Sequence, residues 1–340
     1  MAHKTDFSKD EQLFIHTLTS PDVAKRNDAL ESLKKYFNSL KNKSGKALNE
    51  FEMLKLWKAL YHCYWYSDKL AYQTELCVKL SGLIDEFRDE DMKYLYCKTF
   101  FMTLMREWHN IDYHRVNKYY MFIRIFLNKI MKLWCKMKYA IAAIQPYLDI
   151  LYDTVLSKTP NGMRFHICDI YLPELSQTSD GNLSTNQFVS LLQPFTRSLG
   201  MTDDNHYLER LCEKIFLNII NLYCSKEEQT EVIRFSTVRL NAIQKIIYDI
   251  AIDETIVEKN RKKIYNLHKQ YSQATQEELS TYITEGIEDE SNSGGKKRKM
   301  KLDQTEKEVP TAKDRGRKEK VEIVENTSNT RPRRKATDYF

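Results

Sequence analysis

Helix-start patterns recur along the sequence at intervals of about 20 to 25 residues, and each is followed by apolar residues at helical spacing. One segment starts at Asn49 with Glu52 in the capping-box position. Only 9 Gly and 7 Pro occur in 340 residues, and alternation typical of strands is not sustained anywhere. The sequence therefore predicts an all-α fold.

Short turns between helices of this length favour stacked helix pairs over a four-helix bundle. We expect a HEAT/armadillo-like α-solenoid of antiparallel helix pairs over residues 1–285. Its first helix is predicted to begin at Ser8 and its second at Ser20. The segment 113–137 is apolar nearly all round at its centre, which indicates a central helix packed on both sides.

A break in this pattern is expected near residues 160–183, where Pro173 lies in the segment and Ser-Asp-Gly-Asn follows it. We interpret 163–180 as a short helical piece between irregular segments, and 160–183 as a possible sub-boundary of the domain. Beyond it, helices are predicted over 184–199 and 203–223, and one long helix over 236–271.

The composition changes at residue 286, where Lys, Glu, Ser, Asn and Thr become dominant and no apolar stripe remains. Residues 286–340 are therefore predicted to be a disordered basic tail that holds +4 of the net charge of +6. Two clusters predict nuclear localisation through an import receptor, or contact with RNA phosphates: Lys296, Lys297, Arg298, Lys299 and Lys301, then Arg331, Arg333, Arg334 and Lys335. The alternative is a tail that only improves solubility.

Seven cysteines without a C-x-x-C pair are interpreted as buried free thiols in a reducing compartment. The sequence starts without an apolar leader, and no stretch is long and apolar enough to span a bilayer. We therefore expect neither export nor a membrane partner.

Catalytic and metal-binding patterns are not found in the sequence. His109 and His114 are five residues apart across a helix break, which does not match the spacing of two imidazoles on one ion. Neither a nucleophile motif nor a glycine-rich phosphate loop occurs. No catalytic residue, metal site or cofactor is predicted.

Aromatic and basic residues crowd two segments, 57–66 and 106–124. Trp57, Tyr61 and Trp65 share one helical stripe, so core or groove packing is a stronger interpretation than base stacking. The candidate surface for a partner or RNA consists of Trp57, Lys58, Trp65, Arg106, Trp108, Arg115, Lys118 and Arg124. Pairing of Arg106, Arg115 and Lys118 with nearby acids is the alternative.

Several blocks of the sequence together resemble the nucleolar ribosomal RNA-processing protein 1 family. They are Leu-Trp-Lys-Ala-Leu-Tyr at 56–61, Met-Arg-Glu-Trp at 105–108, Lys-Tyr-Tyr at 118–120, Asp-Ile-Tyr-Leu at 169–172 and Arg-Lys-Lys-Ile-Tyr at 261–265. The resemblance covers about residues 8–272 and departs from the family pattern at Tyr113 and Asn117.

This resemblance implies a non-enzymatic nucleolar assembly factor of the large ribosomal subunit that takes part in processing its precursor RNA. The implied partners are pre-ribosomal particles and other assembly factors, with possible contact to pre-ribosomal RNA. A nuclear transport or chromatin adaptor built on HEAT-like helices is the alternative, and a nuclease is a third hypothesis.

Neutralising the tail clusters tests the predicted nuclear localisation. Replacement of Lys296–Lys299 and Arg333–Lys335 by Gln is expected to shift a fluorescently tagged chain to the cytoplasm, because import receptors bind such clusters through their charge. Unchanged nuclear accumulation in live-cell imaging would refute this role.

Overall fold

The computed structural model describes residues 16–20, 22–40, 48–224, 235 and 237–292. Contacts divide the chain into two units, 1–289 and 290–340, and nearly all described residues belong to the first. The predicted helix at Ser8 and both basic tail clusters lie outside the described residues. The predicted end of the body at residue 285 falls inside the last helix.

Within these ranges every regular element is a helix. The α-helices are α2 (Val23–Leu40), α3 (Glu50–Trp65), α4 (Leu70–Gly82), α5 (Glu90–Glu107), α6 (Tyr113–Lys136), α7 (Ile141–Leu151), α8 (Asn161–Ser179), α9 (Thr185–Leu191), α10 (Gln193–Met201), α11 (Asn205–Leu211), α12 (Asn218–Cys224), α13 (Leu240–Ile252) and α14 (Glu258–Asn292). Short 3-10 turns η1 (Leu83–Glu86) and η2 (Trp108–Asn110) and π-helical segments η3 (Tyr152–Leu156) and η4 (Cys212–Leu217) extend or join them. The all-α prediction is confirmed.

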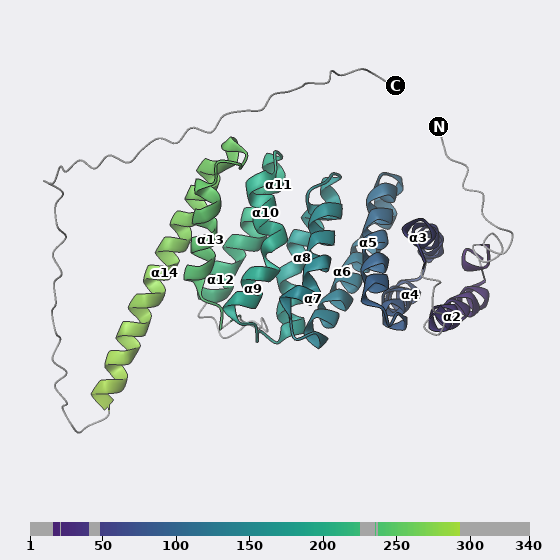
Figure 1. Cartoon of the computed structure of the whole chain (residues 1–340), viewed down its shortest axis with the longest axis horizontal. Coiled ribbons are helices and arrows are strands. Elements are labelled where there is room, and N and C mark those ends of the chain that lie inside the picture. Colours follow the sequence, from purple (N-terminus) through teal and green to yellow (C-terminus); the bar gives the residue numbers. More distant parts are fainter. Residues whose placement is uncertain (1–15, 21, 41–47, 225–234, 236, 293–340) are drawn as a thin grey trace, which may run out of the picture. The chain divides into compact units, whose positions relative to one another are not determined.

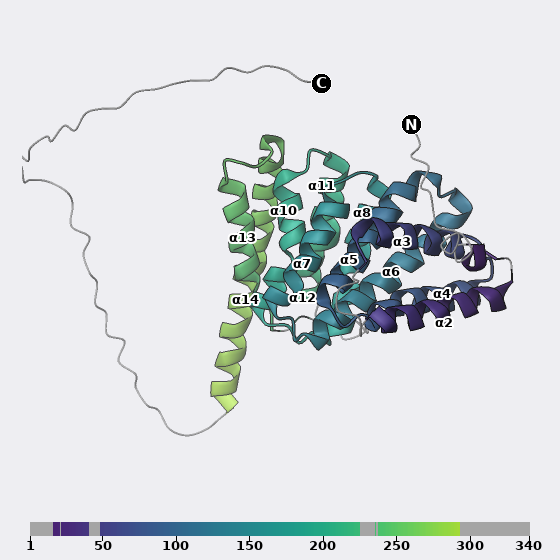
Figure 2. The same cartoon turned by 45° about the vertical axis from the view of Figure 1, so that its right-hand side comes forward.

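Consecutive helices alternate between two layers, as Figures 1 and 2 show for the first unit. We call α3, α5, α7–η3, α9–α10 and α13 the first layer, because each packs against the next. The second layer comprises α4, α6, α8, α11–η4–α12 and α14, where Tyr271 of α14 donates a hydrogen bond to the Phe216 carbonyl of η4 at 2.7 Å. This arrangement of stacked helix pairs is that of an α-solenoid.

The predicted central helix is α6, which packs between α4 and α8. Its Phe122 and Phe126 meet Trp57 of α3 and Phe100 of α5, and the Phe100 and Phe126 rings stack with centroids 3.8 Å apart. Aromatic rings at this spacing add to the stabilisation that burial alone supplies. One continuous hydrophobic core runs between the layers.

The interpretation of 163–180 as a short piece between irregular segments is wrong, because α8 is a continuous helix over Asn161–Ser179. Pro173 removes one backbone hydrogen bond, but its ring is exposed. Buried side chains on both sides of it, including Tyr171, Leu172 and Leu175, offset that cost. The sub-boundary near 160–183 stays a prediction.

The single helix predicted over 236–271 is also wrong, since α13 ends at Ile252 and α14 begins at Glu258. Asp253 closes a turn by accepting the Thr255 N–H at 2.8 Å. Arg261 of α14 donates to the Asp253 carbonyl at 3.1 Å and thereby occupies an acceptor that the end of α13 leaves open. The apolar pattern of the sequence did not reveal this turn, because the turn itself contains a buried apolar residue, Ile256, which packs against Gly200.

The cysteines are mostly as predicted. Cys63, Cys77, Cys97, Cys168 and Cys212 are buried free thiols, whereas Cys135 near the end of α6 is exposed, which corrects the expectation for that residue. Burial raises the pKa of Cys63 to about 12, so this thiol stays protonated at neutral pH.

Truncation of Trp57 tests the core. Trp57→Ala should lower the free energy of unfolding by about 3–5 kcal/mol, because it removes a large side chain that is only 1% exposed. The matched change Lys58→Ala, at an exposed position beside it, should stay within about 0.5 kcal/mol. Urea denaturation followed by circular dichroism measures both, and equal effects would contradict the assignment of Trp57 to the core.

Candidate partner-binding surface

Most of the candidate surface residues lie around one corner of the array, where α3 ends and α5 turns through η2 into α6. The structure divides them into residues that hold the corner together and residues that reach solvent.

Trp57 belongs to the interior. Its indole Nε1 donates a hydrogen bond to the Tyr96 carbonyl at 2.9 Å, and its ring is 1% exposed. No partner can reach this ring in the folded chain, so Trp57 is a core residue and not part of the surface.

Lys118 is buried as well, at 8% exposure, and its ammonium group donates to three carbonyl oxygens at the end of α3. The acceptors are Tyr64 at 3.1 Å, Trp65 at 2.6 Å and Ser67 at 2.9 Å. The last carbonyls of a helix have no partner within the helix, so Lys118 caps α3 from a helix of the next pair. Burial lowers the pKa of Lys118 to about 8.

Arg115 links the start of α6 to the end of α3. Asp112 caps α6 by accepting the Arg115 N–H at 3.0 Å, and its carboxylate also pairs with the Arg115 guanidinium. Burial opposes ionisation of Asp112, but the hydrogen bond and charge of Arg115 outweigh it and lower the pKa of that carboxyl. The guanidinium carbon lies 4.7 Å from the centroid of the Trp65 ring, a cation–π distance.

Trp108 joins this corner to the next helix pair. A Cβ atom at Gly162, in the first turn of α8, would lie 3.0 Å from the Trp108 Nε1 atom, so glycine permits this close approach. The Trp108 ring packs on Tyr120, which in turn packs on His166 with centroids 4.4 Å apart. Trp108 is therefore half-buried and mainly a packing residue.

The remaining candidates are exposed. Arg106 pairs with Glu107 at 3.0 Å, and Arg124 pairs with the buried carboxylate of Glu174 at 2.5 Å. Lys58 is exposed on α3 and forms no ion pair within the described residues. Arg106 and Arg115 are therefore paired with nearby acids, as the alternative interpretation expected, whereas Lys118 donates to backbone carbonyls.

Two exposed tyrosines at the corner were not among the predicted residues. Tyr113, at the first position of α6, is 85% exposed, and Tyr66, directly after α3, is 53% exposed. Apolar periodicity does not reveal them, because both stand at helix ends where the buried stripe stops. We call Trp65, Tyr66, Tyr113, His114 and Arg115 the corner surface.

A hollow of about 470 Å³ adjoins the corner surface between the starts of α4 and α6. Its lining is Ser67, Asp68, Leu70, Gln73, His114, Arg115, Asn117, Lys118 and Met121. Leu70 is 70% exposed at its rim. Apolar and basic groups therefore lie beside the exposed rings, as is usual for protein-binding sites.

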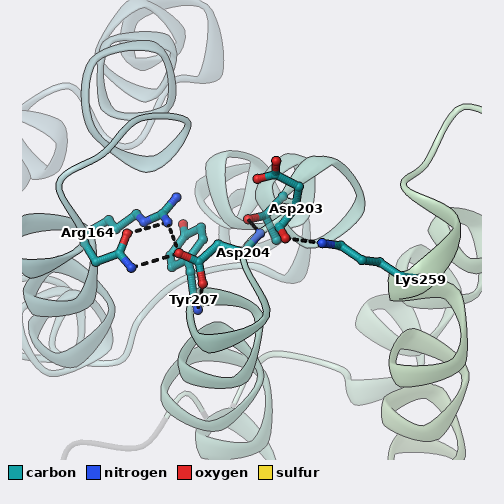
Figure 3. A network of polar contacts seen from close by, with 7 residues as sticks. Arg164, Asp203, Asp204, Tyr207 and Lys259 are labelled. Carbon is teal, nitrogen blue, oxygen red and sulfur yellow. Dashed lines mark hydrogen bonds and ion pairs between the residues drawn. The ribbon is translucent and has the colours of Figure 1, made fainter.

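Polar contacts continue along the same edge of the array at later pairs, as Figure 3 shows. Arg164 of α8 donates to Asp204 at 2.7 Å, and its guanidinium lies 4.2 Å from the Tyr207 ring centroid. Lys259 at the start of α14 donates to the Asp203 carbonyl. The neighbouring Asn260 donates to the Thr202 carbonyl at 2.6 Å, and so repeats at α10 the capping that Lys118 performs at α3.

Within the described residues, no group of three or more His, Cys, Asp or Glu side chains is arranged to hold a metal ion. In the same part of the chain, no helix combines the length and apolar character required to cross a bilayer.

Comparison with known proteins gives one family. Residues 9–335 match the family model described as nucleolar protein, Nop52. The mouse ribosomal RNA processing protein 1 homolog B is 31% identical over 222 residues, which are 64% of this chain and 31% of that protein. The human homolog B is 31% identical over 211 residues, 61% of this chain and 28% of that protein. The Caenorhabditis elegans homolog is 28% identical over 282 residues, 79% of this chain and 69% of that protein.

The chain thus aligns with less than a third of the length of the mouse and human relatives.

Replacement of Lys118 tests the cap on α3. Lys118→Met should lower the free energy of unfolding by about 1–3 kcal/mol, because three carbonyl oxygens lose a charged donor. Lys132→Met, at an exposed position of the same helix, should change it by no more than about 0.5 kcal/mol. Equal small effects in urea denaturation would rule out a capping role.

The pH dependence of this difference supplies a second readout. The pKa of Lys118 is about 8 in the fold against 10.5 as its ordinary value, so between these values the unfolded chain binds more protons. The wild type should then gain stability relative to Lys118→Met as the pH rises from 8 to 10. A difference that is constant over this range would contradict the lowered pKa.

Proposed function

The chain belongs to the Nop52 family of nucleolar proteins, and we propose that it acts as a non-enzymatic helical scaffold in processing the precursor RNA of the large ribosomal subunit. The names of its relatives, ribosomal RNA processing protein 1 homologs, support a role in RNA processing. The proposed location is the nucleolus, and the proposed partners are pre-ribosomal particles and other large-subunit assembly factors. An import receptor is proposed to bind the tail clusters.

The corner surface is the observation that supports a scaffold most directly. Tyr66 and Tyr113 expose their rings beside backbone positions that hydrogen bonds hold in place. Lys118 donates to the carbonyl of Ser67, which follows Tyr66, and Asp112, which precedes Tyr113, caps α6. Exposed aromatic rings on a rigid frame lose little conformational entropy on binding and are enriched at protein interfaces. We propose that another assembly factor binds there.

Sedimentation of cell extracts tests this function. The tagged chain should accumulate in nucleoli and sediment with precursors of the large subunit. Tyr66→Ser with Tyr113→Ser should move much of it to the top of the gradient, because the proposed contact loses both rings. Phe51→Ser, which removes a ring of 56% exposure at the other end of α3, is the matched control.

Both variants must first show the thermal melting of the wild type. Absence of the wild-type chain from nucleoli and from precursor particles would overturn the proposed function. Normal sedimentation of the double variant would overturn the corner surface alone.

A further inference from the structure

The two layers of the array differ strongly in charge, a property that the linear sequence conceals because the layers alternate along it. The first layer carries seven Lys and Arg against eight Asp and Glu. The second layer, counted through residue 276 of α14, carries fifteen Lys and Arg against six Asp and Glu. Folding thus collects the basic helices on one side of the core.

Two helices account for this excess. Between Tyr113 and Lys136, α6 has six Lys and Arg and no acidic residue. Residues 258–276 of α14 have five against one acid, Glu258. The continuation of α14 over residues 277–292 has six acidic residues and no Lys or Arg. The basic part of the helix includes the buried residues Ile264, Leu267 and Tyr271.

Many second-layer charges serve the fold. A ladder of ion pairs joins successive helices: Lys129 with Asp85, Arg124 with Glu174, Arg210 with Asp169, and Lys263 with Glu209. These pairs use three of the six second-layer acids, Asp169, Glu174 and Glu209, together with Asp85 of η1. Few acids are left to neutralise the remaining cations. Glu75 and Glu258 pair within their own helices.

Six exposed lysines of the second layer have no ion pair to any described residue: Lys132, Lys136, Lys214, Lys259, Lys262 and Lys269. Lys259 instead donates to the Asp203 carbonyl. Glu213 is the exposed acid of the layer in the same situation. Lys132 continues the solvent-facing stripe of α6 that includes Arg124, and Lys262, Tyr265 and Lys269 form the corresponding stripe of α14. The first layer differs: its exposed charges without an ion pair among the described residues are mostly acidic, with Lys58 and Lys245 against Glu52, Asp91, Asp153 and Asp249.

We propose that the outer face of the second layer binds the phosphate backbone of RNA, with Lys132 and Lys136 on α6 and Lys262 and Lys269 on α14 as its contacts. This inference rests on the proposed function, which supplies RNA as the polyanion. Lysine ammonium groups on flexible stems neutralise phosphates without reading sequence. Tyr265, 41% exposed between Lys262 and Lys269, offers a ring for one unpaired base.

The separation of the two stripes fits a backbone that extends over several nucleotides. Helices α8 and α11–η4 lie between α6 and α14 in the layer. With about 8–10 Å between packed helices, the stripes are about 25–30 Å apart. RNA carries a phosphate at every nucleotide, so a strand that spans this distance presents negative charge to both stripes. An acidic peptide would need a similar length with acidic residues at both ends.

Two double variants of the full-length chain test the proposal. Lys132→Gln with Lys262→Gln removes one lysine from each basic stripe, and Lys158→Gln with Lys245→Gln removes the same charge from the turn after η3 and from α13, both in the first layer. Both retain the tail, whose contribution to RNA binding cancels in the comparison. The probe is a fluorescein-labelled single-stranded RNA of mixed sequence about 30 nucleotides long, a length chosen to exceed the span between the stripes.

At 0.1 M salt each lost phosphate contact should weaken binding about fivefold, so the second-layer double variant should bind about 25-fold more weakly. Its slope of log affinity against log salt should fall by about 1.4. The first-layer variant should change affinity less than about twofold, since its lysines touch no phosphate. Equal losses in the two variants, or full RNA affinity with lost binding to polyglutamate, would overturn the proposal.

Failure here is separable from failure of the proposed function. If the second-layer variant keeps its RNA affinity while the wild-type chain still sediments with large-subunit precursors, the RNA face is refuted and the scaffold role stands.

Discussion

The ends of two first-layer helices, α3 and α10, impose the constraint on which this array depends, because their last carbonyl groups face the following pair and need donors. Lys118 supplies them for α3, and Asn260 does so for α10. Each donor comes from a second-layer helix of another pair, so a helix end is completed only when its neighbour is in place. The stacking of neighbouring pairs therefore also completes the helix caps. This coupling favours a rigid row of pairs over helical hairpins that fold independently.

The same edge carries the exposed rings that a partner can reach. Tyr113 follows the capping Asp112, and Tyr66 precedes Ser67, whose carbonyl accepts from Lys118. Their positions are thus fixed by contacts one residue away, and binding there costs little ordering of the backbone. The opposite character of the second layer, where unpaired lysines predominate, gives the scaffold two chemically different faces. Both faces suit the proposed role in RNA processing.

Much of the fold could be predicted from the sequence, because caps and apolar stripes are local signals. The capping box of Asn49 and Glu52 is present as expected, and α6 is the central helix. The continuity of α8 through Pro173 could not be foreseen, since it depends on burial by helices distant in sequence. The burial of Trp57 and Lys118, both predicted as surface residues, could not be foreseen either. It depends on the packing of α3 against helices that follow later in the sequence. Periodicity likewise cannot show that the basic helices share a layer.

Crosslinking with mass spectrometry on the chain within purified large-subunit precursor particles tests the two-faced scaffold most directly. The account predicts RNA crosslinks to peptides of α6 and α14 that contain Lys132, Lys262 or Tyr265, and protein crosslinks to the corner around Tyr66 and Tyr113. RNA crosslinks concentrated on first-layer peptides such as those of α3 and α13, with none on α6 or α14, would contradict it.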